Sequence, residues 1–169
     1  MKIVEALKKL NVIEKRIKDN ATDITKYCSV LSSEKPAFGT EEAQKVEVKK
    51  LIQASEDLAT EYLKLKKTIE KTNLAVTATV GGQSYSLSEL LTIKRKLAVL
   101  MQAVYKSLNT STAEQRLMSQ RMHQTAEKTQ VVQLYDESTR NQNLRRWQEL
   151  YEEIDSRLEV INATEDVVA

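Results

Sequence analysis

Apolar residues recur near the start of the sequence at the spacing of helices that pack along a narrow seam. One position of a seven-residue repeat is apolar at every step: Ile3, Leu10, Ile17, Ile24 and Leu31. Four residues further on, the matching position holds Leu7, Ala21 and Cys28, with Glu14 as the exception. This spacing predicts a helix over residues 2–31 with Cys28 as a small core residue, against the alternative of a reactive thiol.

Pro36 and Gly39 interrupt this pattern and predict a loop before a second helix. Thr40 precedes two glutamates, and acidic side chains favour the positive end of the helix dipole. We expect the second helix over residues 41–72. Its seam positions alternate three and four residues apart: Val48, Leu51, Ser55, Leu58, Tyr62, Leu65 and Ile69.

β-branched residues replace the helical pattern between residues 74 and 86, around the pair Gly81 and Gly82. Two glycines between such stretches predict a β-hairpin near 74–86, because both can adopt positive φ. Residues 129–135 have similar composition. The alternative that they add a third strand to the hairpin therefore stays open.

Two more helices are predicted in the second half of the chain. Ser86, with Glu89 three residues later, forms a capping-box pattern that begins a helix near 87–125. Its seam contains Leu87, Leu90, Leu97, Met101, Val104 and Leu108, and Lys94 weakens it. The polar stretch 109–128 either extends this helix or forms an excursion. The last helix is expected near 139–161, with Leu144, Trp147, Tyr151, Ile154, Leu158 and Ile161 along one stripe.

These elements predict a mostly α fold in a single helical domain over residues 1–169. It is an elongated antiparallel bundle of four helices, two or three of them long, with a small β-hairpin that is two- or three-stranded. Narrow seams on long helices bury little within one chain, so we expect a homo-oligomer. The apolar side chains left over as candidate contacts between subunits are Ile13, Ile52, Ile93, Leu100 and Trp147.

Composition supports this fold and argues against most catalytic classes. Among 169 residues there are three glycines, one proline and one cysteine. So few turn residues argue against a sandwich, barrel or propeller, and one cysteine excludes an internal disulfide framework or a zinc knuckle. His123, the single histidine, has no acidic or cysteine neighbour at metal-ligand spacing except Glu127, and reads as a surface residue.

The sequence contains no Gly-rich phosphate loop and no nucleophile elbow. We therefore expect no enzyme, no catalytic residue, no cofactor or metal site and no small-molecule substrate. Lys94, Arg95, Lys96, Arg145 and Arg146 form a candidate basic patch for nucleic acid, against the alternative of solvated helix faces. The formal net charge of +2 is too small to imply nucleic acid by itself.

Charges interrupt the N-terminal residues every few positions, which is unlike a signal peptide, and no apolar run approaches the roughly 20 residues needed to span a bilayer. These features predict a cytoplasmic protein without a transmembrane segment, or one delivered by a route that leaves no signal in the sequence.

Short stretches spread over nearly the whole chain resemble one family. They are residues 2–7 (KIVEAL), 69–73 (IEKTN), 82–91 (GQSYSLSELL), 144–146 (LRR), 154–158 (IDSRL) and 161–164 (INAT). Together they are similar to the septicolysin-like family, which comprises uncharacterised bacterial and phage-encoded proteins. The resemblance implies long antiparallel helices with a small β element and a phage association. Its label implies a membrane-directed cytolysin or pore former.

We expect a non-enzymatic structural or interaction protein that acts through self-assembly. The alternatives are the pore former that the family label implies and a nucleic-acid-binding accessory protein that uses the basic patch.

Overall fold

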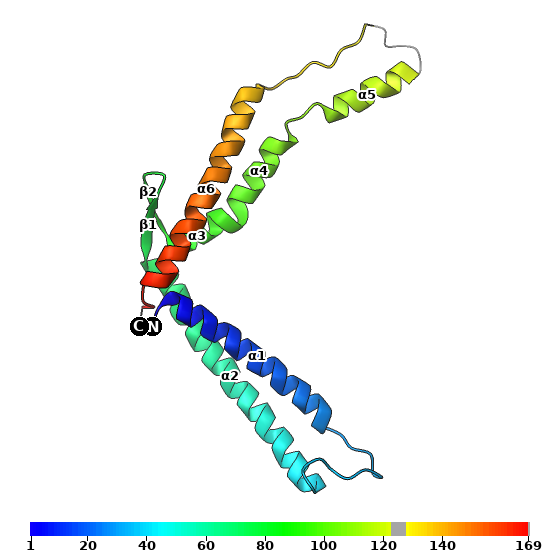
Figure 1. Ribbon diagram of the computed structural model, residues 1–169, viewed down its shortest axis with the longest axis vertical. Coiled ribbons are helices and arrows are strands. Elements are labelled where there is room, and N and C mark those ends of the chain that lie inside the picture. The colour runs from blue at the N-terminus through cyan, green and yellow to red at the C-terminus, as the bar shows by residue number, and fades with distance from the viewer. Residues whose placement is uncertain (123–127, 169) are drawn as a thin grey trace. The chain divides into compact units, whose positions relative to one another are not determined.

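The computed structural model describes residues 1–122 and 128–168, which are mostly helical with one small hairpin (Figure 1). The elements are α1 (Ile3–Tyr27), α2 (Glu41–Ala75), β1 (Thr77–Val80), β2 (Gln83–Ser86), α3 (Leu87–Thr92), the π-helix η1 (Ile93–Leu97), α4 (Ala98–Ser107), α5 (Ser111–Met122) and α6 (Glu137–Thr164). The predicted mostly α class, with helices packed in a bundle and a small antiparallel hairpin, is confirmed.

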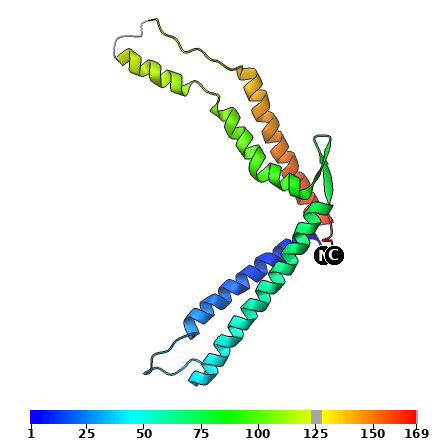
Figure 2. The same ribbon diagram turned by 180° about the vertical axis from the view of Figure 1, so that it is seen from behind.

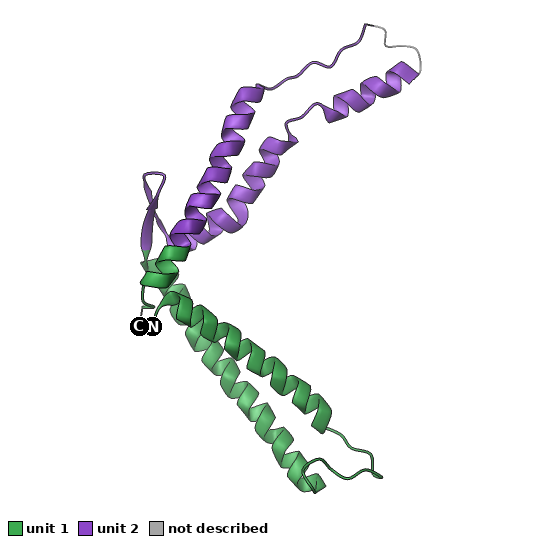
Figure 3. Ribbon diagram, in the orientation of Figure 1, with its two compact units in different colours: residues 1–76, 159–169 green, residues 77–158 purple. Residues whose placement is uncertain are grey.

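The chain divides into two compact units, whereas the sequence predicted one domain over 1–169 (Figure 3). Unit 1 comprises residues 1–76 and 159–169, and unit 2 comprises residues 77–158. Unit 1 therefore contains α1 and α2, and unit 2 contains the hairpin, α3 to α5 and most of α6.

In unit 1, α1 and α2 form an antiparallel pair with an apolar seam. The buried residues of this seam are Ala6, Leu10, Ile13, Leu65 and Ile69, with Ile17, Leu58, Tyr62 and Val167 packed against them. Every predicted seam position of α2 is at least half-buried. The first seam position of α1 is confirmed from Ile3 to Ile24, whereas Leu31, its last predicted member, lies beyond the helix and is 65 % exposed.

The second seam position of α1 was predicted wrongly. It lies three residues after the first, at Ala6 and Ile13, so Leu7 is on the surface. α1 carries apolar side chains both three and four residues after the first seam position. Contact with α2 determines that those three residues after it are buried. Tyr62 Oη donates to Glu14 Oε1 at 2.9 Å, which places Glu14 at the exposed margin of the seam. Ile13 is 2 % exposed and therefore belongs to the core rather than to a subunit contact.

Helix α1 ends at Tyr27, four residues before the predicted end. Gln44 on α2 explains this end, because its Nε2 donates to Tyr27 O at 2.8 Å and its Oε1 accepts from Ala37 N at 2.8 Å. The side chain of Gln44 thereby holds the connecting loop against the end of α1. Cys28 caps the helix and is exposed, so its predicted core position is wrong.

The two terminal segments of unit 1 pair with each other. Ile3 N donates to Glu165 O at 3.0 Å, and Val167 N donates to Met1 O at 2.9 Å. Asp166 accepts a hydrogen bond from Lys2 at 2.8 Å and lies 3.1 Å from the N-terminal ammonium. These hydrogen bonds, with the two positive charges, lower the pKa of the Asp166 carboxyl.

In unit 2 the hairpin forms as predicted, over a shorter range. Ala78 pairs with Tyr85, and Gly81 and Gly82 take φ values of +56° and +79° at the turn. Within the described part of the chain the sheet has only these two strands, and the third strand proposed for residues 129–135 does not form in this chain.

The predicted helix over 87–125 is interrupted twice. Residues 93–97 form a π-helical turn, and α4 ends at Ser107 before α5 begins at Ser111. Residues 123–127 lie outside the described residues. They include His123, Glu127 and the last three residues of the predicted helix.

Helix α6 runs antiparallel to α4 within unit 2. Lys94 forms an ion pair with Asp155, and Arg140 Nε donates to Tyr105 O at 3.1 Å. The predicted stripe on α6 is confirmed as its packed side, since Ile154 and Leu158 are buried and its other members are half-buried.

Candidate interaction surface

The π-helical turn η1 changes which face of α4 is covered. The Ala98 amide donates to Ile93 O, five residues back, so this turn holds one residue more than an α-helical turn. The seam is thereby displaced at two positions. Ala98 is fully buried where the sequence predicted Leu97, and Tyr105 is half-buried where it predicted Val104, whereas Met101 and Leu108 are half-buried as predicted.

This displacement leaves a row of apolar side chains in solvent. Leu97 is 45 % exposed, Leu100 is 60 % exposed and Val104 is 54 % exposed. Their spacing of three and four residues places them on one side of the helix, and we call them the α4 stripe. Residues 97–105 carry no charge, although charged residues make up 30 % of the chain. A helix with one covered side and an uncharged, apolar uncovered stripe is typical of an interaction surface.

The sequence analysis identified part of this surface. Leu100 belongs to the α4 stripe. Ile93 is half-buried in η1 and lies four residues before Leu97, the first residue of the stripe. Leu97 and Val104 were missed because they were assigned to the internal seam. No residue type in 93–97 signals the π-helical turn that displaces them.

The other predicted contacts lie elsewhere. Ile52 is 44 % exposed on α2 in unit 1. Trp147 is half-buried on the packed side of α6, seven residues before the buried Ile154.

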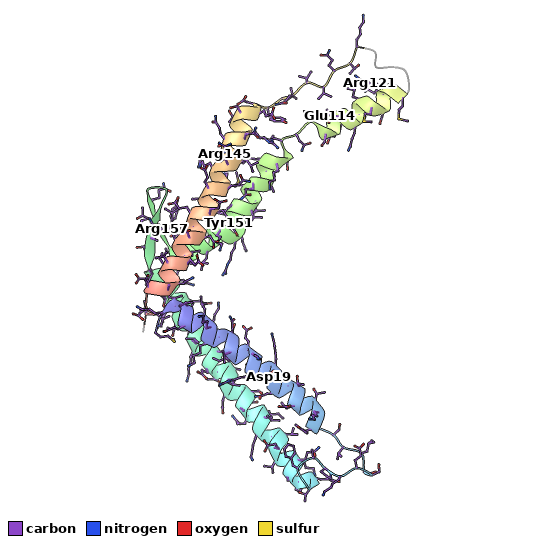
Figure 4. All side chains as sticks on the ribbon, in the orientation of Figure 1. Asp19, Glu114, Arg121, Arg145, Tyr151 and Arg157 are labelled. Carbon is purple, nitrogen blue, oxygen red and sulfur yellow. The ribbon has the colours of Figure 1, made fainter. Side chains whose placement is uncertain are left out.

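The five predicted basic residues do not form one patch. Lys94 pairs with Asp155 and lies 5.7 Å from the centre of the Tyr151 ring, so its charge is already partnered. Arg95 and Lys96 are exposed on η1. Arg145 and Arg146 line a separate cavity of about 340 Å³ that residues of α6 alone form. Figure 4 shows Arg145 on this helix.

A second cavity, of about 440 Å³, lies in unit 1 at the end of α1 and includes Cys28, Gln44 and Lys45. Gln44 already has both hydrogen-bond partners described above. In the described ranges no three His, Cys, Asp or Glu side chains gather as a metal site, and no buried polar side-chain atom lacks a partner. Over the same ranges, no helix combines the length and apolar character needed to cross a bilayer.

No protein-family model, curated protein or solved structure matches this chain. The resemblance to the septicolysin-like family therefore stays a prediction.

Proposed function

We propose that this protein is a non-enzymatic structural protein that acts through self-assembly, with the α4 stripe as a contact between copies. The observation that carries the proposal is the exposure of Leu97, Leu100 and Val104 along an uncharged helix. Covering such a stripe removes apolar surface from water, at about 25 cal/mol for each Å².

A pair of lysine substitutions tests the stripe. Leu100→Lys and Val104→Lys place a charge in the proposed contact, and each is expected to lower the self-association constant at least about tenfold. Leu63→Lys is the matched control. Leu63 is 66 % exposed, but it lies on α2 in unit 1.

Light scattering coupled to size exclusion gives the mass of each variant, and circular dichroism verifies that its helices are intact. A lower mass for Val104→Lys than for Leu63→Lys supports the proposal. Equal masses for both variants would contradict it.

The two alternatives from the sequence have their own readouts. A pore former releases dye from liposomes at micromolar protein. A nucleic-acid-binding protein retains a DNA or RNA probe in a salt-dependent manner that is lost in Arg145→Glu/Arg146→Glu. A cytoplasmic location and a phage association remain predictions from the sequence and its family resemblance.

A further inference from the structure

Residues 131–135 are mostly apolar and lie outside the helices and strands. Val132 and Leu134 are 73 % and 92 % exposed, Gln133 between them is also exposed, and Val131 and Tyr135 are half-buried. Because Val132 and Leu134 are two residues apart, an extended strand would place both of these apolar side chains on one face. Among the described residues, no backbone amide of this segment donates a hydrogen bond to the chain. The amides of residues 131–135 are therefore available to another strand, whereas Tyr135 O already accepts from Gln133 Nε2 at 3.0 Å.

The β-hairpin has open strand edges with which a further strand can pair. β1 and β2 form a sheet of two strands, so each has one open edge. Residues 72–88 carry no charge and no proline. Sheet edges that must not pair are usually protected by charged residues or proline, and a sheet of two strands is only marginally stable alone. The hairpin has the features of an acceptor for a third strand.

The segment cannot reach the hairpin of its own chain in the orientation that pairing needs. β2 leads directly into α3 and η1, and η1 is joined to Asp155 of α6 through Lys94. Residues 131–135 end where α6 begins, at Glu137, which is about 27 Å along the helix from Asp155. Since α6 is a continuous helix, it holds the two apart, and the acceptor must belong to another copy.

The charges on the exposed side of α6 favour a specific arrangement of two copies. Arg145 and Arg146 lie in its N-terminal half, and Glu149, Glu152 and Glu153 follow one to two turns later, all exposed. Of the described residues in unit 2, only Lys94 and Asp155 form an ion pair. Like charges at Glu149 and Glu153 are unfavourable within one helix. Two α6 helices in antiparallel orientation would place the arginines of each against the glutamates of the other.

We propose that two copies associate about a two-fold axis, with residues 131–135 of each added as a third strand to the hairpin of the other. The two α6 helices run antiparallel in this dimer, with Arg145 and Arg146 of one copy facing Glu152 and Glu153 of the other. The hairpin and α4 lie on opposite sides of α6 in both views, so this contact leaves the α4 stripe free (Figure 1, Figure 2). The inference rests on the proposed self-assembly and adds a second contact to it.

Charge exchange tests the arrangement of the helices. Arg145→Glu/Arg146→Glu and Glu152→Arg/Glu153→Arg are each expected to weaken the dimer about tenfold, because like charges then face each other. The protein with all four substitutions restores the complementary charges and is expected to recover the association. Because all four residues are exposed, a folding defect does not explain a loss that the fourfold variant reverses. A fourfold variant as weak as the two double variants would overturn the arrangement.

Hydrogen exchange of the full chain tests the strand pairing. At high protein concentration the amides of residues 131–135 are expected to exchange at least about tenfold more slowly than in dilute protein. Val132→Pro, which removes one of these amides, is expected to abolish the slowing at its neighbours. The slowing is also expected to persist in Val104→Lys, which affects only the α4 stripe.

Three outcomes distinguish this inference from the proposed function. A monomer at every concentration would overturn both. A multimer that is dissociated by Val104→Lys, while residues 131–135 exchange at the dilute rate, would overturn the strand pairing alone. Concentration-dependent slowing at residues 131–135 and in β1 or β2 supports it.

Discussion

Asn20 Nδ2 donates a hydrogen bond to Ser55 Oγ at 3.1 Å, across the seam between α1 and α2. Ser55 Oγ in turn donates to Leu51 O at 2.8 Å. Both Asn20 and Ser55 are half-buried at seam positions that are otherwise mostly apolar. A polar pair in such a seam can form only in one alignment of the two helices, so it fixes their register.

We predict that Asn20 and Ser55 are energetically coupled. Asn20→Ala and Ser55→Ala should each lower the free energy of unfolding, and a double-mutant cycle should give a coupling of about 0.5–1.5 kcal/mol, the usual net value of a hydrogen bond. Urea denaturation of the four proteins measures it. Strictly additive effects would show that the pair does not stabilise this register.

The core of unit 1 predicts a sharp difference between two apolar residues of α2. Ile69 is 3 % exposed in the seam, and Leu63 is 66 % exposed on the surface. Ile69→Ala is expected to cost about 2–5 kcal/mol because it leaves a cavity, while Leu63→Ala should change stability by less than about 0.5 kcal/mol. Thermal unfolding of both variants checks this. Similar losses at the two positions would contradict the assigned seam.

Gln44 is predicted to hold the loop between α1 and α2. Gln44→Ala leaves Tyr27 O and Ala37 N without their partner and should cost about 1–3 kcal/mol. The amide of Ala37 should then exchange much faster in hydrogen-exchange experiments. Gln53→Ala, which removes only an exposed hydrogen bond to Asp57, is the matched control and should leave the Ala37 amide unchanged.

The start of α6 is predicted to depend on pH through Asp136. Hydrogen bonds from the side chain and backbone of Thr139 lower the pKa of the Asp136 carboxyl, and Thr139 N lies 2.7 Å from its Oδ2. Because its pKa is lowered in the folded state, the ionised Asp136 carboxyl stabilises the fold. This stabilisation is complete above the ordinary pKa of aspartate and is lost as pH falls through the folded-state pKa. The first turn of α6 should therefore loosen at acid pH, as NMR shifts of Thr139 can follow.

Asp136→Asn provides the control for that titration. Asparagine also caps helices but does not ionise, so the Thr139 amide should keep its shift across the same pH range. A variant that titrates like the native protein would show that another group controls this turn.

The elements predicted correctly from the sequence are those whose hydrophobic or capping pattern allows only one arrangement. The seam of α2 alternates without interruption, and the capping box at Ser86 is present, with Glu89 N donating to Ser86 Oγ at 3.3 Å and Ser86 N to Glu89 Oε2 at 2.7 Å. Around α1 the pattern allowed two solutions, since Ala6 and Leu7 are both apolar. Only contact with α2 selected Ala6.

The candidate interaction surface could be predicted only in part, because it depends on one backbone hydrogen bond. The π-helical bond from Ala98 N to Ile93 O moves Leu97 and Val104 out of the seam, and no residue type in 93–97 specifies such a turn. Leu100 and Ile93 were identified because they lay outside the predicted seam. The uncharged run 97–105 was visible in the sequence, but it fitted a core helix equally well.

The mass of the full chain in solution tests the central claim most directly. Light scattering coupled to size exclusion, at two protein concentrations and two salt concentrations, should give a mass that is a multiple of 19.3 kDa and rises with protein concentration. A mass of 19.3 kDa under all four conditions would contradict self-assembly as the function of this protein.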